Sequence, residues 1–279
     1  MLNALSIDVE DYFQVEAFSR VIDRAEWSTF PCRVAENTRR VLRLLETHQV
    51  RATFFVLGWV AEREPELVRE IAAAGHEIAT HGYGHQLIYR QTPEEFAEDV
   101  RRSIQAIGDA LPDAKILGYR APSFSITLQS LWALDILAGL GIRYDSSIFP
   151  MSGHDLYGIP DAPRFAHRVR PQLCEFPVST VRYARRNWPV AGGGYFRLFP
   201  LPLTRYAIRR INSEHQPAVV YLHPWEFDPE QPRIHQASMK SRFRHYLNLH
   251  KTETRLHRLL GHFRFAPLRE VFASHLANP

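Results

Sequence analysis

Short runs of apolar, β-branched and aromatic residues alternate along this chain with segments whose apolar residues recur at helical spacing. Several of the short runs are almost continuously apolar, which is typical of parallel strands covered by helices on both faces. The predicted strands are Ala4–Ile7, Ala52–Leu57, Glu77–Thr80, Ile116–Tyr119, Ile142–Tyr144, Cys174–Val178 and Ala218–Leu222. Their alternation with helices predicts an α/β fold, a parallel sheet or barrel with right-handed crossovers.

Helix-end signals fall between these strands. Thr92-Pro93-Glu94-Glu95 is a capping box with proline at the first helical position, and Gly75 and Gly141 are stop signals. The predicted helices are Val34–His48, Glu64–Gly75, Thr92–Ala110, Thr127–Gly139 and Leu203–Asn212. No low-complexity linker or repeat divides the chain, so we predict one domain over residues 1–279 with a basic helical extension from about residue 238.

Composition narrows the class of protein. The chain has 279 residues, 45% of them hydrophobic, and only two cysteines, so it can bury one large core without a disulfide framework. A net charge of +4 without a recognition motif disfavours a nucleic-acid binder. The N-terminus lacks the features of a signal peptide, and no apolar run approaches the roughly 18 residues that cross a bilayer. We therefore expect a cytoplasmic protein without a transmembrane segment.

Polar residues gather where the predicted strands end. In chain order these segments are Asp8-Val-Glu-Asp11, Gly58-Trp59, Thr80-His81-Gly-Tyr-Gly-His85, Tyr119-Arg120-Ala-Pro122, Asp145-Ser-Ser, Ser179-Thr180 and His223-Pro-Trp-Glu226. An active site at one end of a barrel requires polar groups at the carboxyl ends of many strands. The distribution therefore favours a distorted (β/α) barrel with about seven parallel strands over an open sheet.

Two histidines could share one metal ion. His81 and His85 directly follow a strand and are separated by Gly-Tyr-Gly, which lets the backbone turn tightly. A hydrolytic metal site takes three protein ligands and keeps one position for water. Asp8, Glu10 and Asp11 offer a third ligand and a separate base. The alternatives are a surface turn with two solvated imidazoles and an acidic strand exit that caps the next helix.

Two common hydrolase motifs are absent from the sequence. The segment from His76 to His81 has one residue too many for the HExxH helix of zinc proteases. The chain contains no Gly-x-Ser-x-Gly nucleophile elbow, so a serine hydrolase is disfavoured.

Five motifs resemble, in order, those of the NodB-type polysaccharide deacetylases, carbohydrate esterase family 4, which fold as a distorted β/α barrel. They are Ser6-Ile-Asp8-Val-Glu10-Asp11, Thr80-His81-Gly-Tyr-Gly-His85, Tyr119-Arg120-Ala-Pro122-Ser-Phe, Tyr144-Asp145-Ser-Ser and Leu222-His223-Pro. The eleven residues from Asp8 to Phe18, and the tail that follows Gly192–Arg197, resemble the branch found with exosortase-linked (PEP-CTERM) exopolysaccharide loci. The resemblance spans about residues 2–272.

The resemblance implies an enzyme that hydrolyses the N-acetyl group of an amino sugar in a bacterial polysaccharide or its precursor. It implies a divalent cation, zinc before cobalt, nickel or manganese, held by His81, His85 and an acidic residue. The implied roles are Asp8 as general base, Arg120 as the cation that orients it, His223 as general acid, Asp145 as the carboxylate that keeps His223 protonated, Leu222 as lining of the acetyl pocket, and the backbone N–H near Ser123 as part of an oxyanion site.

Motif one departs from the usual pair of adjacent aspartates. Val9 and Glu10 intervene, so a regular strand would point Asp8 and Glu10 to one side, whereas a bulge would present Asp11. Between Glu10 and Asp11 as the acidic metal ligand, our preference is Asp11. Motif three carries Ser123-Phe124 where Tyr-Gly is common, which reshapes the sugar subsite and keeps the backbone donor.

The C-terminal region is basic. Its cations include Arg242, Arg244, Lys251, Arg255 and Arg258. We interpret them as a solvated helix face, with contact to an acidic glycan or a membrane surface as the functional alternative. Trp225 is a candidate for stacking on a sugar ring. The rival functions are a barrel hydrolase acting on a small cyclic amide or ureide and a catalytically silent glycan-binding protein.

Overall fold

The computed structural model describes residues 1–154, 156–190 and 192–277. Within this part of the chain, each of the seven predicted strands is present, some of them shorter than predicted. The strands are β1 (Leu2–Val9), β2 (Thr53–Val56), β3 (Glu77–Thr80), β4 (Gly118–Tyr119), β5 (Tyr144–Asp145), β6 (His167–Arg170), β7 (Leu173–Glu175), β8 (Thr180–Tyr183), β9 (Arg186–Pro189), β10 (Val219–Leu222) and β11 (Arg264–Ala266).

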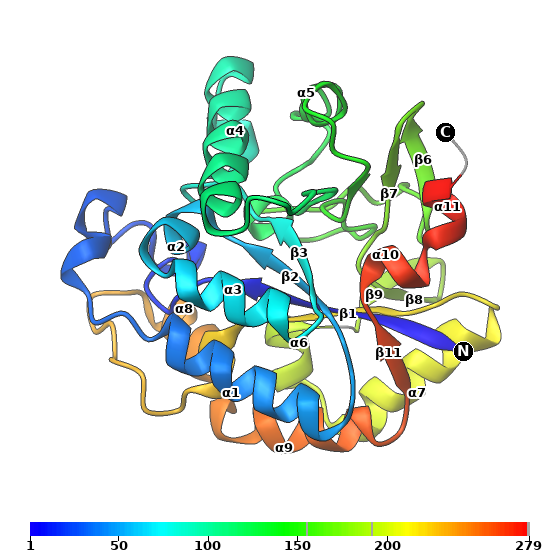
Figure 1. The fold of residues 1–279 in the computed structure, drawn as a ribbon. Coiled ribbons are helices and arrows are strands. Elements are labelled where there is room, and N and C mark those ends of the chain that lie inside the picture. Colours follow the sequence, from blue (N-terminus) through cyan, green and yellow to red (C-terminus); the bar gives the residue numbers. More distant parts are fainter. Residues whose placement is uncertain (155, 191, 278–279) are drawn as a thin grey trace.

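Nine of these strands form one curled sheet in the order β10-β1-β2-β3-β4-β5-β7-β6, with β11 added beside β1 (Figure 1). Neighbours are parallel except β6 and β7, and β8 pairs with β9 in a separate antiparallel hairpin. The sheet nearly closes beyond β7. The N–H of Ser179 donates to the Val219 carbonyl on β10 (3.3 Å), and the N–H of Val219 donates to Ser179 Oγ (2.8 Å). The predicted distorted barrel of mainly parallel strands is confirmed.

Helices surround the sheet. The α-helices are α1 (Val34–Thr47), α2 (Gly58–Arg63), α3 (Pro65–Ala73), α4 (Pro93–Ala110), α5 (Ala133–Gly139), α6 (Gly193–Leu198), α7 (Leu201–Ser213), α8 (Met239–Tyr246), α9 (Leu249–Leu260), α10 (Leu268–Val271) and α11 (Ala273–Ala277). Single 3₁₀ turns are η1 (Glu16–Phe18), η2 (Arg24–Thr29), η3 (Ile88–Arg90), η4 (Pro122–Phe124) and η5 (Pro224–Phe227). None of the described helices combines the length and apolar character needed to cross a bilayer.

Two helix starts show how local hydrogen bonds decide a boundary. The capping box of α4 is confirmed, because Thr92 Oγ1 accepts the N–H of Glu95 (3.2 Å) and Glu95 Oε2 accepts the N–H of Thr92 (2.8 Å). The helix predicted over 127–139 begins only at Ala133. Ser130 Oγ accepts the N–H of Thr127 (2.9 Å), and this turn replaces the first helical residues.

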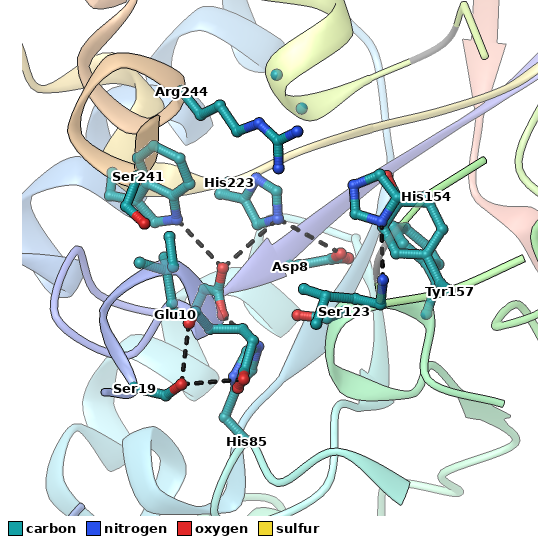
Figure 2. Close-up of a pocket in the computed structure, with 18 of the residues that line it drawn as sticks. Asp8, Glu10, Ser19, His85, Ser123, His154, Tyr157, His223, Ser241 and Arg244 are labelled. Carbon is teal, nitrogen blue, oxygen red and sulfur yellow. Dashed lines mark hydrogen bonds and ion pairs between the residues drawn. The ribbon is translucent and has the colours of Figure 1, made fainter. Parts of the chain in front are cut away.

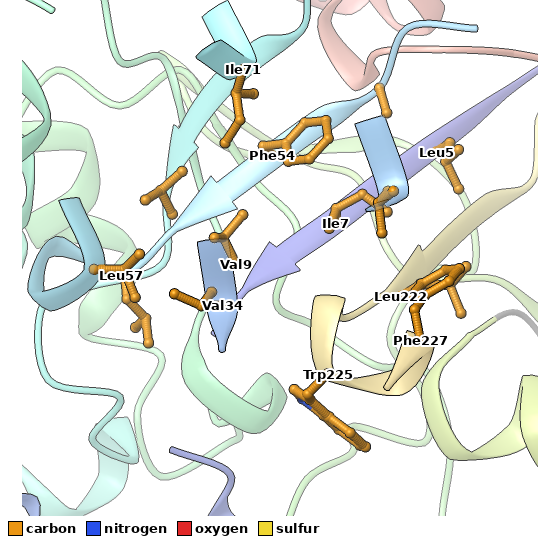
Figure 3. Packing of buried hydrophobic residues seen from close by; sticks show 14 of the residues in the cluster. Leu5, Ile7, Val9, Val34, Phe54, Leu57, Ile71, Leu222, Trp225 and Phe227 are labelled. Carbon is orange, nitrogen blue, oxygen red and sulfur yellow. The ribbon is translucent and has the colours of Figure 1, made fainter. Parts of the chain in front are cut away.

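Successive residues of the central strands face two different cores. Leu5, Ile7 and Val9 pack in the outer core, between the sheet and the helices that cover it (Figure 3). Phe55 and Tyr144 belong to the inner core of the barrel. Because side chains alternate along a strand, the residues between the outer-core positions of β1 face the barrel interior. This alternation points Ser6 and Asp8 toward the interior.

The segment that follows residue 238 is part of this architecture. Helix α9 buries Leu256 and Leu259 in the outer core. Strand β11 then pairs with the first residues of β1, Leu2 lying opposite Arg264 and Ala4 opposite Ala266. The basic C-terminal segment therefore contributes a strand to the main sheet in addition to its helices.

Candidate active site

Glu10, His81 and His85 bring their ligating atoms within 4.8 Å of one another, and all three side chains are buried. Glu10 follows β1 and His81 follows β3. His85 adopts a left-handed backbone conformation (φ 48°), which turns its imidazole back toward the strand ends. Nδ1 of His81 lies 2.8 Å from the Arg120 carbonyl, which leaves Nε2 for a ligand.

These three residues fit a divalent cation. Among the described residues, Glu10 Oε2 has no hydrogen-bond partner, although it lies 2.7 Å from Nε2 of His85. Burial lowers the pKa of His81 to about 4, so this imidazole is neutral at pH 7, as a metal ligand must be. Burial acts to raise the pKa of Glu10, but the nearby histidines hold it well below its usual range. Two imidazoles and one carboxylate are a donor set that zinc accepts.

Asp11 lies outside this cluster, which corrects the preference for it as metal ligand. Its Oδ1 accepts the N–H of Tyr12 (2.8 Å), and its Oδ2 accepts the N–H groups of Arg33 (2.6 Å) and Val34 (2.8 Å) at the start of α1. Strand β1 ends at Val9, and the N–H of Glu10 donates to the Asp8 carbonyl (3.0 Å), so the chain turns there. After this turn Glu10 lies with the two histidines, whereas Asp11 is held at the start of α1. The helix-capping alternative describes Asp11 correctly.

Asp8 and Arg120 form a buried ion pair beside the cluster. Arg120 is fully buried, and its Nη1 donates to Asp8 Oδ1 (2.6 Å) and to Ser6 Oγ (2.7 Å). Its Nε and Nη2 bind the carbonyl and hydroxyl of Ser146 at 3.0 and 2.8 Å. The guanidinium is therefore fixed from several sides, and it holds the Asp8 carboxylate through Oδ1.

His223 faces the cluster from the end of β10. Its Nε2 lies 3.5 Å from Glu10 Oε1 and 3.9 Å from Asp8 Oδ2, and its Nδ1 lies 3.1 Å from Glu226 Oε2. The other oxygen of Glu226 accepts from buried Arg197 at 2.6 Å. Burial acts to lower the pKa of His223, but the hydrogen bond and charge of Glu226 raise it to about 9. The imidazolium form is therefore present at pH 7.

The carboxylate beside His223 is Glu226, whereas Asp145 was predicted in this position. This is a second correction. Asp145 is fully buried, accepts from the Ser147 hydroxyl, and lies opposite Glu175 on β7. Burial raises the pKa of Asp145 to about 6. The signal for Glu226 was its position three residues after His223, where the first turn of η5 returns its carboxylate to the His223 N–H (2.9 Å).

Leu222 and Trp225 support the site from the core. Leu222 is fully buried in the outer core (Figure 3), so it does not line the cleft as predicted; its neighbour Tyr221 does. Trp225 is 95% buried (5% exposed), stacks on His223, and donates from Nε1 to Glu10 Oε1 (3.2 Å). Trp225 therefore fixes Glu10, and little of its ring is open to a sugar.

A cleft of about 460 Å³ opens over these residues (Figure 2). Its floor contains Asp8, Glu10, His81, His85 and His223, and one wall contains Ser123. Ser123 adopts a left-handed backbone conformation (φ 51°) in η4. The cleft thus brings together residues from β1, β3, β4 and β10 at one end of the barrel, with a metal-type cluster, a carboxylate base and an imidazolium in a single cavity.

Comparisons with known proteins agree with this geometry. Residues 22–144 match the family model described as polysaccharide deacetylase, and residues 146–273 match a model described as a domain of unknown function, DUF3473. The chain is 39% identical over 101 residues to a chitooligosaccharide deacetylase of Bradyrhizobium, covering 36% of this chain and 43% of that protein. It is 34% identical over 89 residues to a peptidoglycan-N-acetylglucosamine deacetylase of Bacillus cereus, covering 32% and 30%. The matched stretch is under half the length of these relatives.

Solved structures extend the likeness to the whole fold. A crystal structure described as a putative polysaccharide deacetylase from Mycobacterium smegmatis superposes with a TM-score of 0.64 at 21% identity, covering 98% of this chain and 89% of that one. A carbohydrate esterase family 4 pseudoenzyme of Bacillus anthracis gives 0.51 at 15% identity, covering 97% and 64%. Residues 22–144 therefore match the polysaccharide deacetylase family model, and the chain as a whole has the fold of the NodB-type deacetylases, carbohydrate esterase family 4.

Proposed function

We propose that this protein is a metal-dependent deacetylase that hydrolyses the N-acetyl group of an amino sugar in a bacterial polysaccharide or its precursor. The observation that carries the proposal is the single cleft in which Glu10, His81 and His85 converge beside Asp8 and His223. The names of the matched relatives point to acetylated glycans as substrates. The motif-one segment and the tail after Gly192 further suggest an exopolysaccharide of the exosortase-linked type.

Amide hydrolysis needs an activated water, a stabilised oxyanion and a proton for the leaving amine. Glu10, His81 and His85 would hold a divalent cation, zinc in the first place. A bound cation of this kind supplies Lewis-acid chemistry that makes water nucleophilic near pH 7 and polarises a carbonyl.

The remaining steps belong to side chains of this protein. Asp8 accepts the water proton at Oδ2, because its Oδ1 is occupied by Arg120. His223 donates its Nε2 proton to the departing amine while Glu226 holds Nδ1. The backbone N–H of Ser123, in the cleft wall, is the proposed second donor to the oxyanion. A binding protein would need neither a base nor an acid in these positions.

The test is release of acetate from N-acetylglucosamine oligomers by metal-stripped and zinc-reconstituted protein. We expect activity only after reconstitution, and we expect Asp8→Asn to lower kcat by about 10²–10⁴-fold because the proton acceptor is lost. His81→Gln should lose both the metal and the activity. His250→Gln, an exposed histidine outside the cleft, is the matched control and should behave as wild type.

Small cyclic amides and ureides belong in the same assay. A reconstituted protein that hydrolyses these compounds and leaves every N-acetyl glycan intact would replace the proposed substrate class. A protein that binds metal and glycan yet hydrolyses neither group of compounds would be the silent glycan-binding protein, and would end the proposal.

A further inference from the structure

Cations gather at the mouth of the cleft among the residues that the structure describes. Four cations line it, namely Arg20, Arg90, Lys240 and Arg244. The acids in the same cleft already have partners. Asp8 pairs with Arg120, Glu10 lies against His85, and Glu16 accepts from Arg90 at 3.1 Å.

Of these cations Arg90 pairs with Glu16, whereas Arg20 and Arg244 have no carboxylate partner among the described residues. Both are exposed, so their charge is available to a ligand. Arg244 belongs to α8, and its guanidinium lies at the edge of the cleft near His223 (Figure 2). Arg20 follows η1, and α8 packs against η1. The two cations therefore border the same mouth from adjacent elements.

Arg244 also reaches the opposite wall electrostatically. Burial raises the pKa of Tyr157 well above its usual value, and the positive charge of Arg244 opposes that rise. Tyr157 and His154 line the wall that faces His223 (Figure 2). The guanidinium thus projects over the cavity between two walls, close to where a sugar would enter.

Other cations of the C-terminal segment are differently placed. Arg255 on α9 donates to the carbonyls of Phe196 (2.8 Å) and Arg197 (2.7 Å), which is a structural role. Arg258, also on α9, does not line the cleft. An acidic ligand at the active site would therefore meet α8 and the turn after η1, while α9 packs against the core.

We propose that the cleft selects N-acetylated sugars that carry an anionic group beside the acetylated unit, and that Arg244 and Arg20 bind this group. The inference rests on the proposed deacetylase function and deepens it by naming a substrate class. A guanidinium matches the paired oxygens of a carboxylate or a phosphate, and unpaired cations at a cleft mouth also raise the rate of encounter with anions. The shared chemistry is the anion, as a uronate or as a sugar phosphate.

The experiment compares three substrates on the zinc-loaded protein by acetate release. They are a neutral N-acetylglucosamine tetramer, an oligomer that alternates N-acetylglucosamine with glucuronate, and UDP-N-acetylglucosamine. For wild type we expect kcat/KM to favour an anionic substrate, with a preference that shrinks at high salt. Preference for the second substrate identifies a carboxylate, and preference for the third a phosphate.

The variants are R244Q, R20Q and the double variant, with R258Q as the matched loss of charge outside the cleft. We expect the ratio of kcat/KM for anionic over neutral substrate to fall about 3–10-fold in each single variant and further in the double variant, as befits exposed ion pairs. R258Q should keep the wild-type ratio. A wild type without preference, or an equal effect of R244Q and R258Q, would overturn the inference.

A binding measurement separates this inference from the proposed function. Calorimetric titration of the glucuronate-containing oligomer and of UDP-N-acetylglucosamine into wild type and R244Q needs no turnover. Tighter binding of either ligand to wild type than to R244Q, in a protein that releases no acetate, supports the cation site and rejects the deacetylase. If wild type and R244Q bind each ligand equally and acetate release is intact, the deacetylase function is supported and the cation site is rejected.

Discussion

His76 shows how one buried side chain can make stability depend on pH. It is 7% exposed, and its Nδ1 accepts the N–H of Ala52 (3.1 Å), which requires a neutral ring. Burial lowers the pKa of His76 to about 4 from an ordinary 6.5. Between pH 6.5 and about 4, the unfolded chain therefore binds a proton on His76 and the folded chain does not. The contribution of neutral His76 to the free energy of unfolding is complete above pH 6.5 and is lost as the pH falls toward 4.

We predict that His76→Asn flattens the pH dependence of unfolding between pH 6.5 and 4. The asparagine carbonyl can accept the same N–H without titrating, so the variant should lose about 2 kcal/mol less than wild type over this range. Urea unfolding at several pH values measures the difference. Parallel curves for the two proteins would contradict this explanation.

Most of the residues proposed for the site from the sequence lie close together in the fold. Asp8, His81, His85 and His223 line one cleft, and Arg120 lies buried against Asp8, because all five are at or just after the carboxyl ends of strands in the same sheet. The choice between Glu10 and Asp11 depended on the path of the chain after β1 ends at Val9, which the residue pattern does not determine. Asp145 was predicted as the carboxylate beside His223 in place of Glu226 for a similar reason. Only the fold determines which carboxylate reaches this imidazole.

The sheet nearly closes at a seam where Ser179, which follows β7, meets Val219 on β10. The Ser179 side chain makes one of the two hydrogen bonds at this seam. Ser179 Oγ accepts the Val219 N–H, which otherwise would be buried without a partner. We predict that Ser179→Ala lowers the free energy of unfolding by about 1–2 kcal/mol. Ser213→Ala, at the exposed end of α7, is the control and should change it by less than about 0.5 kcal/mol. If urea unfolding gave the same loss of free energy for both variants, the hydrogen bond at the seam would not contribute to stability.

The helices and strands that could be predicted from the sequence were those with strong apolar patterns. The hairpin β8–β9 was missed because it is polar and largely exposed, and because its turn uses Ala184 (φ 47°) and Arg185 (φ 63°) in left-handed conformations. An Asn-Gly pair would have signalled this turn. β11 pairs with β1 from the opposite end of the chain, and β6 is a mostly polar strand that pairs with its neighbour β7.

Metal binding and folding should be linked, because Glu10 follows β1 whereas His81 and His85 follow β3. We predict that removing the metal with a chelator lowers Tm by about 5 °C, as expected for a ligand bound well above its Kd. Differential scanning calorimetry with and without zinc measures the shift. A Tm that is the same in both conditions would contradict the metal assignment.

Two variants separate ligand from helix cap in the same measurement. Glu10→Gln should abolish the response to zinc. Asp11→Ala should lower Tm in both conditions, by the equivalent of about 1–2 kcal/mol for a lost cap, and keep the response. The reverse pattern would restore Asp11 as the ligand.

Strand β1 lies between β2 and β10 with β11 beside it, although β10 and β11 come near the end of the chain. During synthesis β1 leaves the ribosome first and keeps one edge open until those strands emerge. Open apolar edges invite wrong pairing, so folding of this protein should be late and vulnerable to truncation. A chain stopped before β10 would contain the whole stretch that matches the deacetylase family, yet it would have neither a complete sheet nor His223.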